Sequence, residues 1–170
     1  LAGLESRNQA KTFIYALLYG AGDSKLGSVA GGGASVGERL RRSFFDNLPS
    51  FATLKHSITR TTETRDHLKG LDGRKIPVRS AHSALNTLLQ GAGAIVMKQA
   101  LVILNDKIKH LDAHFVANVH DEWQIEVRED QADELGRLGV EAIIEAGKVF
   151  KLKCPLDGEY KVGDDWSETH

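Results

Sequence analysis

One stretch of the chain repeats cationic and phenolic residues at every fourth position. Arg7, Lys11, Tyr15 and Tyr19 follow this spacing, which keeps their side chains on one side of a helix with 3.6 residues per turn. The two cations lie nearest the N-terminus of that helix, where the positive end of the helix dipole and unpaired N–H groups attract anions. A triphosphate could therefore contact Arg7 and Lys11 while a ring stacks on Tyr15. The alternative is a surface helix whose cations extend into solvent.

A second candidate pair is Asn86 and Gln90, which are four residues apart in a segment with helical periodicity. Amide side chains both donate and accept hydrogen bonds, which suits the degenerate minor-groove edges of base pairs. Gly91 and Gly93 follow and permit close approach of another backbone. The alternative, and the more common use of such amides, is a hydrogen bond to the protein's own backbone.

A third group, His120, Asp121 and Glu122, stands between two short apolar runs at residues 115–119 and 123–127. This pattern predicts a β-hairpin with the three polar residues at its tip. The exposed carboxylate of Asp121 would be a good ligand for a hard cation, and Glu122 would assist it or only orient it. The second histidine of an H-E-x-x-H zinc motif is absent. The alternative is an ordinary charged hairpin turn.

These groups need helices and strands to position them, and the sequence predicts several. Ser6 is expected to cap a helix that begins at Arg7 and runs through Tyr19, with Gln9 completing a capping box. The other expected elements are helices near Ser35 and after Pro49, a hairpin turn at Asp72 and Gly73, a long helix from Ser83 to about Leu111, an amphipathic helix over residues 130–147 and a short strand within residues 152–166. Helices followed by an antiparallel hairpin predict an α+β fold.

Composition narrows the class of protein. The chain has 170 residues, enough for a real hydrophobic core, and one cysteine, Cys154, which excludes an internal disulfide and a cysteine-based zinc site. A reducing compartment is the simplest setting. No uninterrupted apolar run reaches the roughly 18 residues that span a membrane, and no secretory leader is recognisable. We therefore expect no membrane association. Because the chain does not begin with methionine, we also expect it to be a fragment.

The formal net charge of −1 hides an uneven distribution of charge along the chain. Residues 1–113 hold 16 basic and 9 acidic residues, whereas residues 114–170 hold 6 basic and 14 acidic residues. The basic part could meet phosphates and the acidic part could hold cations. The alternative is that both are ordinary solvated surfaces.

Three blocks, in this order, resemble family A DNA polymerases of the type that replicates short-tailed phages. RNQAKTFIYALLYGAGDSKLG, at residues 7–27, resembles the fingers motif with its R-x-x-x-K-x-x-x-Y-x-x-x-Y-G pattern. LDGRKIPVRSAHSALNTLLQGAGA, at residues 71–94, resembles the segment that leads into a palm helix, and VHDE, at residues 119–122, resembles a catalytic palm motif. The resemblance implies helical fingers over residues 1–79, with a hairpin at 66–79, and the C-terminal half of the palm over residues 80–170.

The resemblance also implies a role for each candidate residue. The catalytic residues would be Asp121, Lys11 and Glu122, with Asp121 binding two Mg²⁺ ions that lie about 4 Å apart in such sites and Lys11 protonating the pyrophosphate. Arg7, Lys11 and Tyr15 would bind the deoxynucleoside triphosphate, and a tyrosine at the position of Tyr15 goes with acceptance of dideoxynucleotides. The residues implied to contact the primer–template DNA are Tyr19, Gly20, Asn86, Gln90 and His120.

One departure from the family pattern is the absence of the second catalytic aspartate. The family carries this residue in a motif upstream of the fingers helix. The chain is therefore expected to add deoxynucleotides to a primer only with an upstream segment or second polypeptide that carries the thumb and the remaining palm. It would then be a split subunit, a cloned fragment or an inactive relic, located in the cytoplasm of a bacterial host if phage-encoded. The alternative function is a non-catalytic DNA-binding fragment that retains the fold. A metal-dependent phosphohydrolase built around His120 and Asp121 is a third hypothesis.

Overall fold

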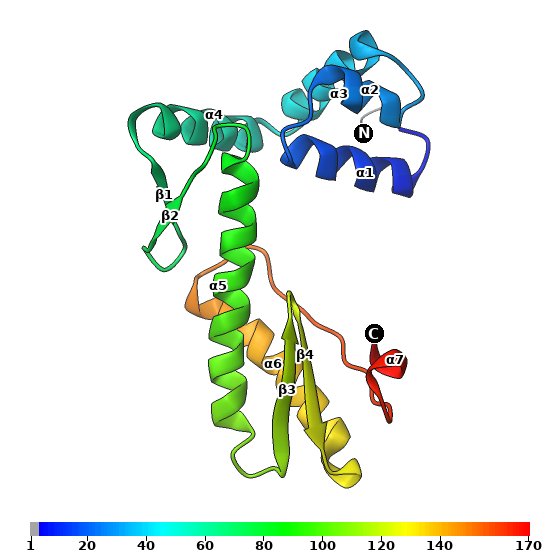
Figure 1. Ribbon diagram of the computed structural model, residues 1–170, viewed down its shortest axis with the longest axis vertical. Helices are drawn as coiled ribbons and strands as arrows, with labels where there is room; N and C mark the ends of the chain where they lie inside the picture. Colours follow the sequence, from blue (N-terminus) through cyan, green and yellow to red (C-terminus); the bar gives the residue numbers. More distant parts are fainter. Residues whose placement is uncertain (1–3) are drawn as a thin grey trace. The chain divides into compact units, whose positions relative to one another are not determined.

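A computed structural model describes residues 4–170 and divides the chain into two compact units, Leu1–Gln90 and Gly91–His170 (Figure 1). Among the described residues, the first unit contains four helices and one hairpin, and the second contains another hairpin and two helices, while a long helix runs through the unit boundary. The helices are α1 (Arg7–Leu18), α2 (Asp23–Val29), α3 (Ala34–Asn47), α4 (Pro49–Thr64), α5 (Ala84–Lys107), α6 (Ala132–Val149) and α7 (Trp166–Thr169), with a 3₁₀ turn, η1, at Glu129–Gln131. The predicted α+β class is confirmed. The predicted boundary between residues 79 and 80 divides fingers from palm and stays a prediction.

Helix α1 begins where its capping residues predict. Ser6 has an extended backbone, and its hydroxyl oxygen accepts a hydrogen bond from the Gln9 N–H at 3.1 Å. The side-chain oxygen of Gln9 accepts from the N–H of Glu5 at 2.9 Å, one residue before the position that a strict capping box uses. The helix ends at Leu18, one residue earlier than predicted.

Helices α2 and α3 pack against each other through glycines. A Cβ atom on Gly37 would lie 1.8 Å from the backbone oxygen of Asp23, and a Cβ on Gly27 would lie 2.0 Å from that of Gly33. The guanidinium of Arg41 adds an ion pair with Asp23 at 2.8 Å. The sequence did not predict α2, because its flanking glycines indicate a break in helical structure. The glycines at positions 27 and 37 lie within α2 and α3 and permit the two helix backbones to touch.

Two apolar clusters form the core of the first unit. Phe13 and Leu17 of α1 are buried with Leu26 of α2 and Leu40 of α3. The second cluster joins α4 to the hairpin of β1 (His67–Lys69) and β2 (Lys75–Pro77), and its buried members are Ile58, Leu68, Ala84 and Leu85. The β1–β2 hairpin confirms the predicted turn, in which Gly73 adopts a φ of 85°.

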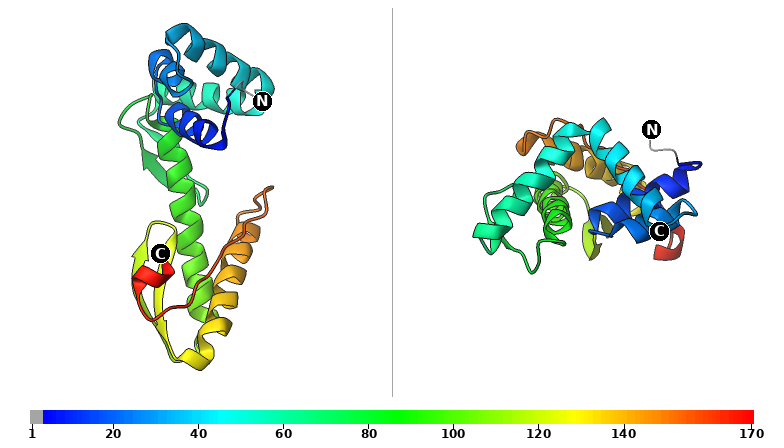
Figure 2. Two further views of the ribbon diagram at one scale, coloured as in Figure 1. Left: turned by 90° about the vertical axis from the view of Figure 1, so that its right-hand side faces the viewer. Right: turned by 90° about the horizontal axis from the view of Figure 1, so that it is seen from above.

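In the second unit, the C-terminal part of α5 lies beside α6 and the hairpin of β3 (Ala113–Val119) and β4 (Glu122–Val127), as both Figure 1 and Figure 2 show. The helix is continuous through Gly91 and Gly93. The apolar core of the second unit joins α5, α6 and the β3–β4 hairpin. The buried residues are Val96, Ala100, Leu104, Ile108, Leu111, Leu135, Ala142 and Ala146. The predicted hairpin and the predicted amphipathic helix are both confirmed.

By length and composition alone, α5 is long and apolar enough to cross a membrane, with a mean hydropathy of 1.5 over 18 residues. The expectation drawn from uninterrupted apolar runs did not include this helix, because polar residues divide the small and aliphatic residues that dominate α5. A core helix passes the same test. Ala100 and Leu104 of α5 are fully buried within the second unit, which explains part of its apolar character.

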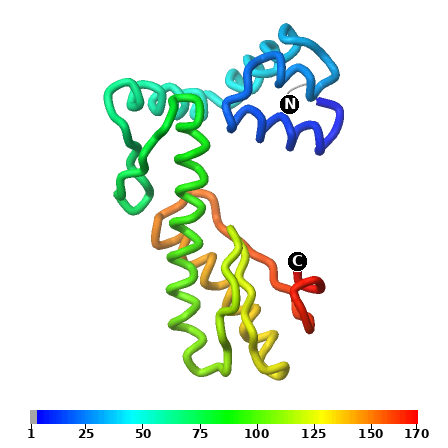
Figure 3. Tube along the Cα trace, viewed as in Figure 1, coloured from blue at the N-terminus to red at the C-terminus, as the bar shows by residue number. Residues whose placement is uncertain are grey.

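The chain after α6 contains no strand within residues 152–166, so the predicted short strand is wrong. Pro155, Gly158 and Gly163 interrupt any regular ladder in this segment. Figure 3 follows this segment from α6 to α7, which lies beside the β3–β4 hairpin. Side-chain contacts rather than strand pairing therefore hold this segment.

The glycine contact between α2 and α3 gives a prediction about stability. Gly37→Ala should lower the free energy of unfolding by about 1–3 kcal/mol, because its methyl group would meet a backbone oxygen that cannot rotate away. Thermal unfolding followed by circular dichroism measures the change. Gly93→Ala is the matched control, since nothing lies within 4 Å of its Cβ position. Equal melting temperatures for the two variants would show that α2 and α3 are not packed in this way.

Candidate active site

The predicted stripe on α1 faces away from the core. Phe13 and Leu17 are buried, which turns Arg7, Lys11, Tyr15 and Tyr19 outward. Tyr15 is 52% exposed and Tyr19 is 57% exposed, so both phenol rings are available for contact. The Lys11 ammonium lies 6.0 Å from the centre of the Tyr15 ring, at the outer limit of a cation–π contact. The four side chains therefore form one exposed surface, which we call the α1 stripe.

The positive charges of the α1 stripe are not neutralised within the described chain. The first turn of α1 contains no acidic residue, and neither Arg7 nor Lys11 forms an ion pair with any residue between 4 and 170. The helix dipole adds positive potential at the same end. This arrangement suits a polyanion such as a triphosphate.

Three of the residues predicted to contact DNA lie together at the end of α1. The side-chain nitrogen of Gln90 donates a hydrogen bond to the Tyr19 hydroxyl at 3.0 Å. Gly20 has a φ of 80°, and a Cβ there would lie 2.8 Å from the backbone oxygen of His82. Only glycine fits this position without strain. The contact of His82 with Gly20 was not predicted, because residues 62 positions apart share no local pattern.

Asn86 lies one turn before Gln90 on α5 and is half-buried. No hydrogen bond joins either amide to backbone within residues 4–170, since Gln90 bonds to a hydroxyl and Asn86 has no side-chain hydrogen bond there. The backbone-bonding alternative therefore finds no support in the described part of the chain. Both amides remain able to bond to a ligand.

The β3–β4 hairpin presents Asp121 at its tip, as predicted. Val119 pairs with Glu122, which leaves His120 and Asp121 as a two-residue turn. His120 adopts a φ of 53°, a left-handed conformation that histidine tolerates better than most residues. Both side chains are exposed, and the Asp121 carboxylate has no ion-pair partner among residues 4–170. Its oxygens are therefore free for a cation.

Glu122 has different surroundings from its neighbour. Its side chain is 29% exposed, and its carboxylate accepts hydrogen bonds from Gln124 and Trp166 and contacts His170. The bond from Gln124, followed by the contact with His170, lowers the pKa of the Glu122 carboxyl below its usual value. Sequence reasoning missed Trp166 and His170 as partners, because more than forty residues separate them from Glu122.

The described chain supplies only part of a metal site. Residues 4–170 contain no group of three or more histidine, cysteine, aspartate or glutamate side chains arranged to hold a metal ion. Mg²⁺ prefers six oxygen ligands in near-octahedral geometry, and Asp121 offers the one free carboxylate at the hairpin tip. A complete site would need further oxygens from DNA, nucleotide or another segment. The phosphohydrolase hypothesis, which requires additional ligands near His120, finds none among these residues.

Comparison with known proteins identifies relatives along the whole chain. Residues 3–168 match the family model for DNA polymerase family A. The chain is 42% identical to a DNA-directed DNA polymerase of Escherichia phage Phieco32 over its full length and 39% identical to that of Enterobacteria phage T3 over 99% of its length. It is 34% identical to the thermostable DNA polymerase I of Thermus filiformis over 96% of its length. The chain spans 27% of the T3 polymerase, 29% of the Phieco32 polymerase and 21% of the Thermus enzyme.

A solved structure gives the same result for the fold. The POL domain of Pol1 from M. smegmatis, in complex with DNA primer–template and dNTP, superposes on 82% of the chain with a TM-score of 0.73 and 23% identity. The superposed part is 27% of that polymerase chain. The fold, the family match over residues 3–168 and the identity to phage polymerases agree, and the chain therefore belongs to DNA polymerase family A, as a portion similar to phage polymerases.

Proposed function

We propose that this chain is the fingers and C-terminal palm portion of a DNA-directed DNA polymerase. It would help to add deoxynucleotides to the 3′ end of a primer by phosphoryl transfer with two Mg²⁺ ions. The observation that carries this proposal is the α1 stripe, whose exposed cations have no ion-pair partner within residues 4–170. Family membership makes an incoming triphosphate the natural anion for that surface.

In this proposal, the chain's own residues bind and orient the reactants. Arg7 and Lys11 hold the phosphates, and the Lys11 ammonium donates a proton to the leaving pyrophosphate. Tyr15 packs against the sugar and base of the nucleotide. Asp121 would be this chain's ligand to two Mg²⁺ ions, which would supply charge stabilisation for the attacking and leaving oxygens. The remaining carboxylate would come from the upstream palm motif.

DNA would contact the end of α1 in the first unit and the hairpin tip in the second unit. Tyr19 and Gly20 would lie beside the templating base, while Asn86 and Gln90 would bond to minor-groove edges, which carry acceptors at every base pair. His120 would lie at the primer terminus. The bond between Tyr19 and Gln90 would then couple the template side to the minor-groove side.

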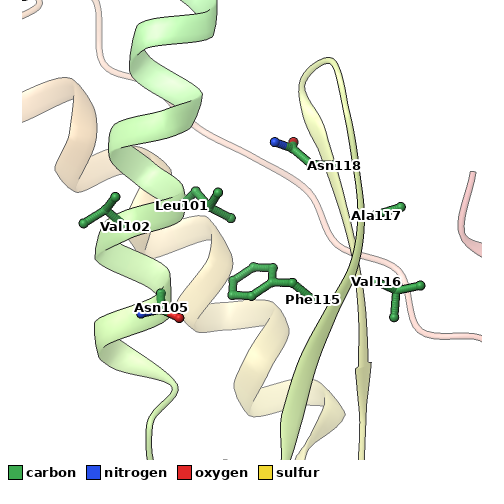
Figure 4. A pocket seen from close by; sticks show the side chains of 7 residues that line it. All are labelled: Leu101, Val102, Asn105, Phe115, Val116, Ala117 and Asn118. Atoms are coloured by element: carbon green, nitrogen blue, oxygen red, sulfur yellow. The ribbon is translucent and has the colours of Figure 1, made fainter.

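An apolar groove in the second unit supports the need for another segment. It lies between α5 and β3 and has a volume of about 420 Å³. Figure 4 shows its lining, with the Phe115 ring directed toward α5. The lining residues are Leu101, Val102, Asn105, Phe115, Val116, Ala117 and Asn118. Val102 is 58% exposed and Val116 is 67% exposed, so this surface would be covered by a packed neighbour in a complete palm.

The β3 strand also has a free edge. Its sheet contains only β3 and β4 within residues 4–170, so one row of β3 backbone groups has no strand partner there. The register shifts between Phe115 and Ala117, which produces a bulge at Val116. We propose that a strand from the upstream palm pairs at this edge and covers the groove. That strand would belong to the same polypeptide or to a second one, in the cytoplasm of a bacterial host.

A non-catalytic DNA-binding fragment is the alternative function. It is favoured by the lack, among the described residues, of any group of three or more side chains that could hold a metal ion. Restoration of catalysis by a complementing segment would separate the two functions.

The first prediction from the proposed function concerns nucleotide binding. In the polymerase assembled from this chain and its complementing segment, Lys11→Ala should slow nucleotide incorporation by about tenfold to a hundredfold, because a charge-assisted contact contributes roughly 1.5–3 kcal/mol. Single-turnover incorporation measures this rate, and DNA affinity should change far less. Lys25→Ala, an exposed lysine on α2, is the matched control. An incorporation rate for Lys11→Ala equal to that of the control would contradict the role of Lys11.

The second prediction concerns sugar selection. Tyr15→Phe should increase discrimination against dideoxynucleotides. The hydroxyl of Tyr15 can reach the triphosphate region and replace an interaction that the missing 3′-hydroxyl would have made, and phenylalanine lacks this hydroxyl. Competitive incorporation of the two nucleotide types measures the ratio. Tyr19→Phe removes a hydroxyl that bonds to Gln90 and should leave the ratio unchanged. Unaltered discrimination by Tyr15→Phe would argue against this placement of α1.

The third prediction concerns the missing carboxylate. The 170-residue chain alone should not extend a labelled primer and should associate in size-exclusion chromatography, because its apolar groove and β3 edge are uncovered. Addition of a fragment that bears the upstream palm motif should restore Mg²⁺-dependent extension.

The control for this experiment is a matched pair of substitutions in the hairpin. Asp121→Asn should abolish the restored extension, whereas Glu126→Gln, at an exposed position on β4, should not. Robust extension by the chain alone would refute the proposal, since it would place the second carboxylate within this sequence.

A further inference from the structure

The segment that ends in α7 contacts the hairpin that carries Asp121. The indole N–H of Trp166 donates a hydrogen bond to one carboxylate oxygen of Glu122 at 2.9 Å. The Nδ1 atom of His170 lies 3.0 Å from the other oxygen. Both oxygens of Glu122 are therefore occupied by side chains from the far end of the second unit, immediately next to the turn that presents Asp121.

A second contact reinforces the first. Gln124 follows Glu122 by two residues, so both side chains lie on the same face of β4. The Gln124 amide donates to Glu122 at 2.5 Å, and its carbonyl oxygen accepts from the Thr169 hydroxyl at 3.1 Å. The rings of Trp166 and His170 pack edge to face at 5.9 Å. Three residues of one segment thus bond to two neighbouring side chains on one strand.

The segment is organised for this contact by its own hydrogen bonds. A helix of four residues is not stable in isolation. Asp165 accepts hydrogen bonds from the Ser167 N–H at 2.8 Å and from its hydroxyl at 2.6 Å. Glu168 accepts from the N–H of Asp164 at 2.9 Å. These bonds close the turn before and within α7, so that Trp166 and His170 present their donors together.

We propose that Trp166–His170 is a brace for the active-site hairpin, in which Trp166, Thr169 and His170 are positioning residues. They immobilise Glu122 and Gln124 on β4 and thereby fix the adjoining two-residue turn that carries Asp121. In this proposal Glu122 acts through Asp121, because Gln124 and Trp166 both donate to one of its oxygens and His170 contacts the other, which leaves fewer lone pairs for a cation than Asp121 has. The catalytic consequence rests on the proposed polymerase function, whereas the contact itself does not.

Hydrogen exchange followed by mass spectrometry tests the brace without any catalytic reaction. Trp166→Phe keeps a ring but removes the indole donor, and Thr169→Val keeps the shape of threonine but removes its hydroxyl. Each variant should speed exchange of the backbone amides in peptides covering residues 118–127, by about tenfold in Trp166→Phe, where a charge-assisted bond is lost. Val162→Ala, an exposed position in the same segment, is the control and should leave the hairpin unchanged.

Kinetics of the assembled polymerase test the catalytic consequence. A positioning role predicts that Trp166→Phe and His170→Phe raise the Mg²⁺ concentration for half-maximal extension by about tenfold or more, with little change in KM for the nucleotide. His170→Gln keeps a donor and should recover most of the loss. A merely structural role would lower the active fraction without moving the Mg²⁺ dependence.

The two measurements separate failure of the brace from failure of the polymerase function. Unchanged hairpin exchange in Trp166→Phe and Thr169→Val would overturn the brace, whether or not the assembled protein polymerises. Faster exchange with an unmoved Mg²⁺ dependence would overturn its effect on Asp121. The last outcome comes from Glu122→Gln. If this variant lost extension even at saturating Mg²⁺, as Asp121→Asn is expected to do, Glu122 would be a metal ligand and the proposal would be refuted.

Discussion

Burial of the apolar face of α1 determines what the rest of the first unit can present. Phe13 and Leu17 are buried with Leu26 and Leu40, and this packing fixes the rotation of α1 about its axis. Because a helix has 3.6 residues per turn, this rotation also determines the direction in which each of its other side chains points. Arg7 and Lys11 must face outward, and a rotation that buried either cation would carry a large desolvation cost. The chemistry of the α1 stripe therefore depends on an apolar contact that involves none of its residues.

Core packing also fixes the direction of the side chains in the hairpin of the second unit, where they alternate with a period of two residues. Pairing of Val119 with Glu122 leaves a turn of two residues, and the alternation of a strand directs neighbouring side chains to opposite faces. Apolar residues of β3 and β4 pack against α5 and α6, so a shift of one residue in register would bury polar side chains. Core packing thus places Asp121 at the tip. As a result, the position of one carboxylate depends on the burial of residues throughout the second unit.

Local patterns in the sequence were sufficient for the elements that carry the candidate residues. The Ser6 cap, the four-residue spacing on α1 and the alternating runs around His120 each depend on neighbours in the chain, and each was confirmed. The order of three motifs in the chain indicated a resemblance to family A polymerases, and the family match confirms that resemblance. The assigned roles in catalysis and DNA binding remain predictions.

Contacts between distant segments account for what the sequence did not predict. Helix α2 was missed because glycines flank it on both sides, although Gly27 within it lets another helix approach. The expected strand in residues 152–166 was wrong, and the bonds from Trp166 and Thr169 to Glu122 and Gln124 that hold the end of the chain have no counterpart in any local pattern. Such contacts are set by the three-dimensional path of the chain, which periodicity alone does not encode.

Asp121 and Glu122 show how surroundings can give adjacent carboxylates different roles. Both are acidic, and the sequence alone left open whether Glu122 assists Asp121 or only orients it. In the structure, Glu122 accepts hydrogen bonds that lower its pKa, with the Gln124 amide as the largest cause, whereas Asp121 is exposed at the turn. A carboxylate that already accepts several hydrogen bonds has fewer lone pairs left for a cation than a free carboxylate has. In the proposed polymerase, a metal ion would therefore bind to Asp121 in preference to Glu122, and the bonds to Glu122 would hold the start of β4 in place.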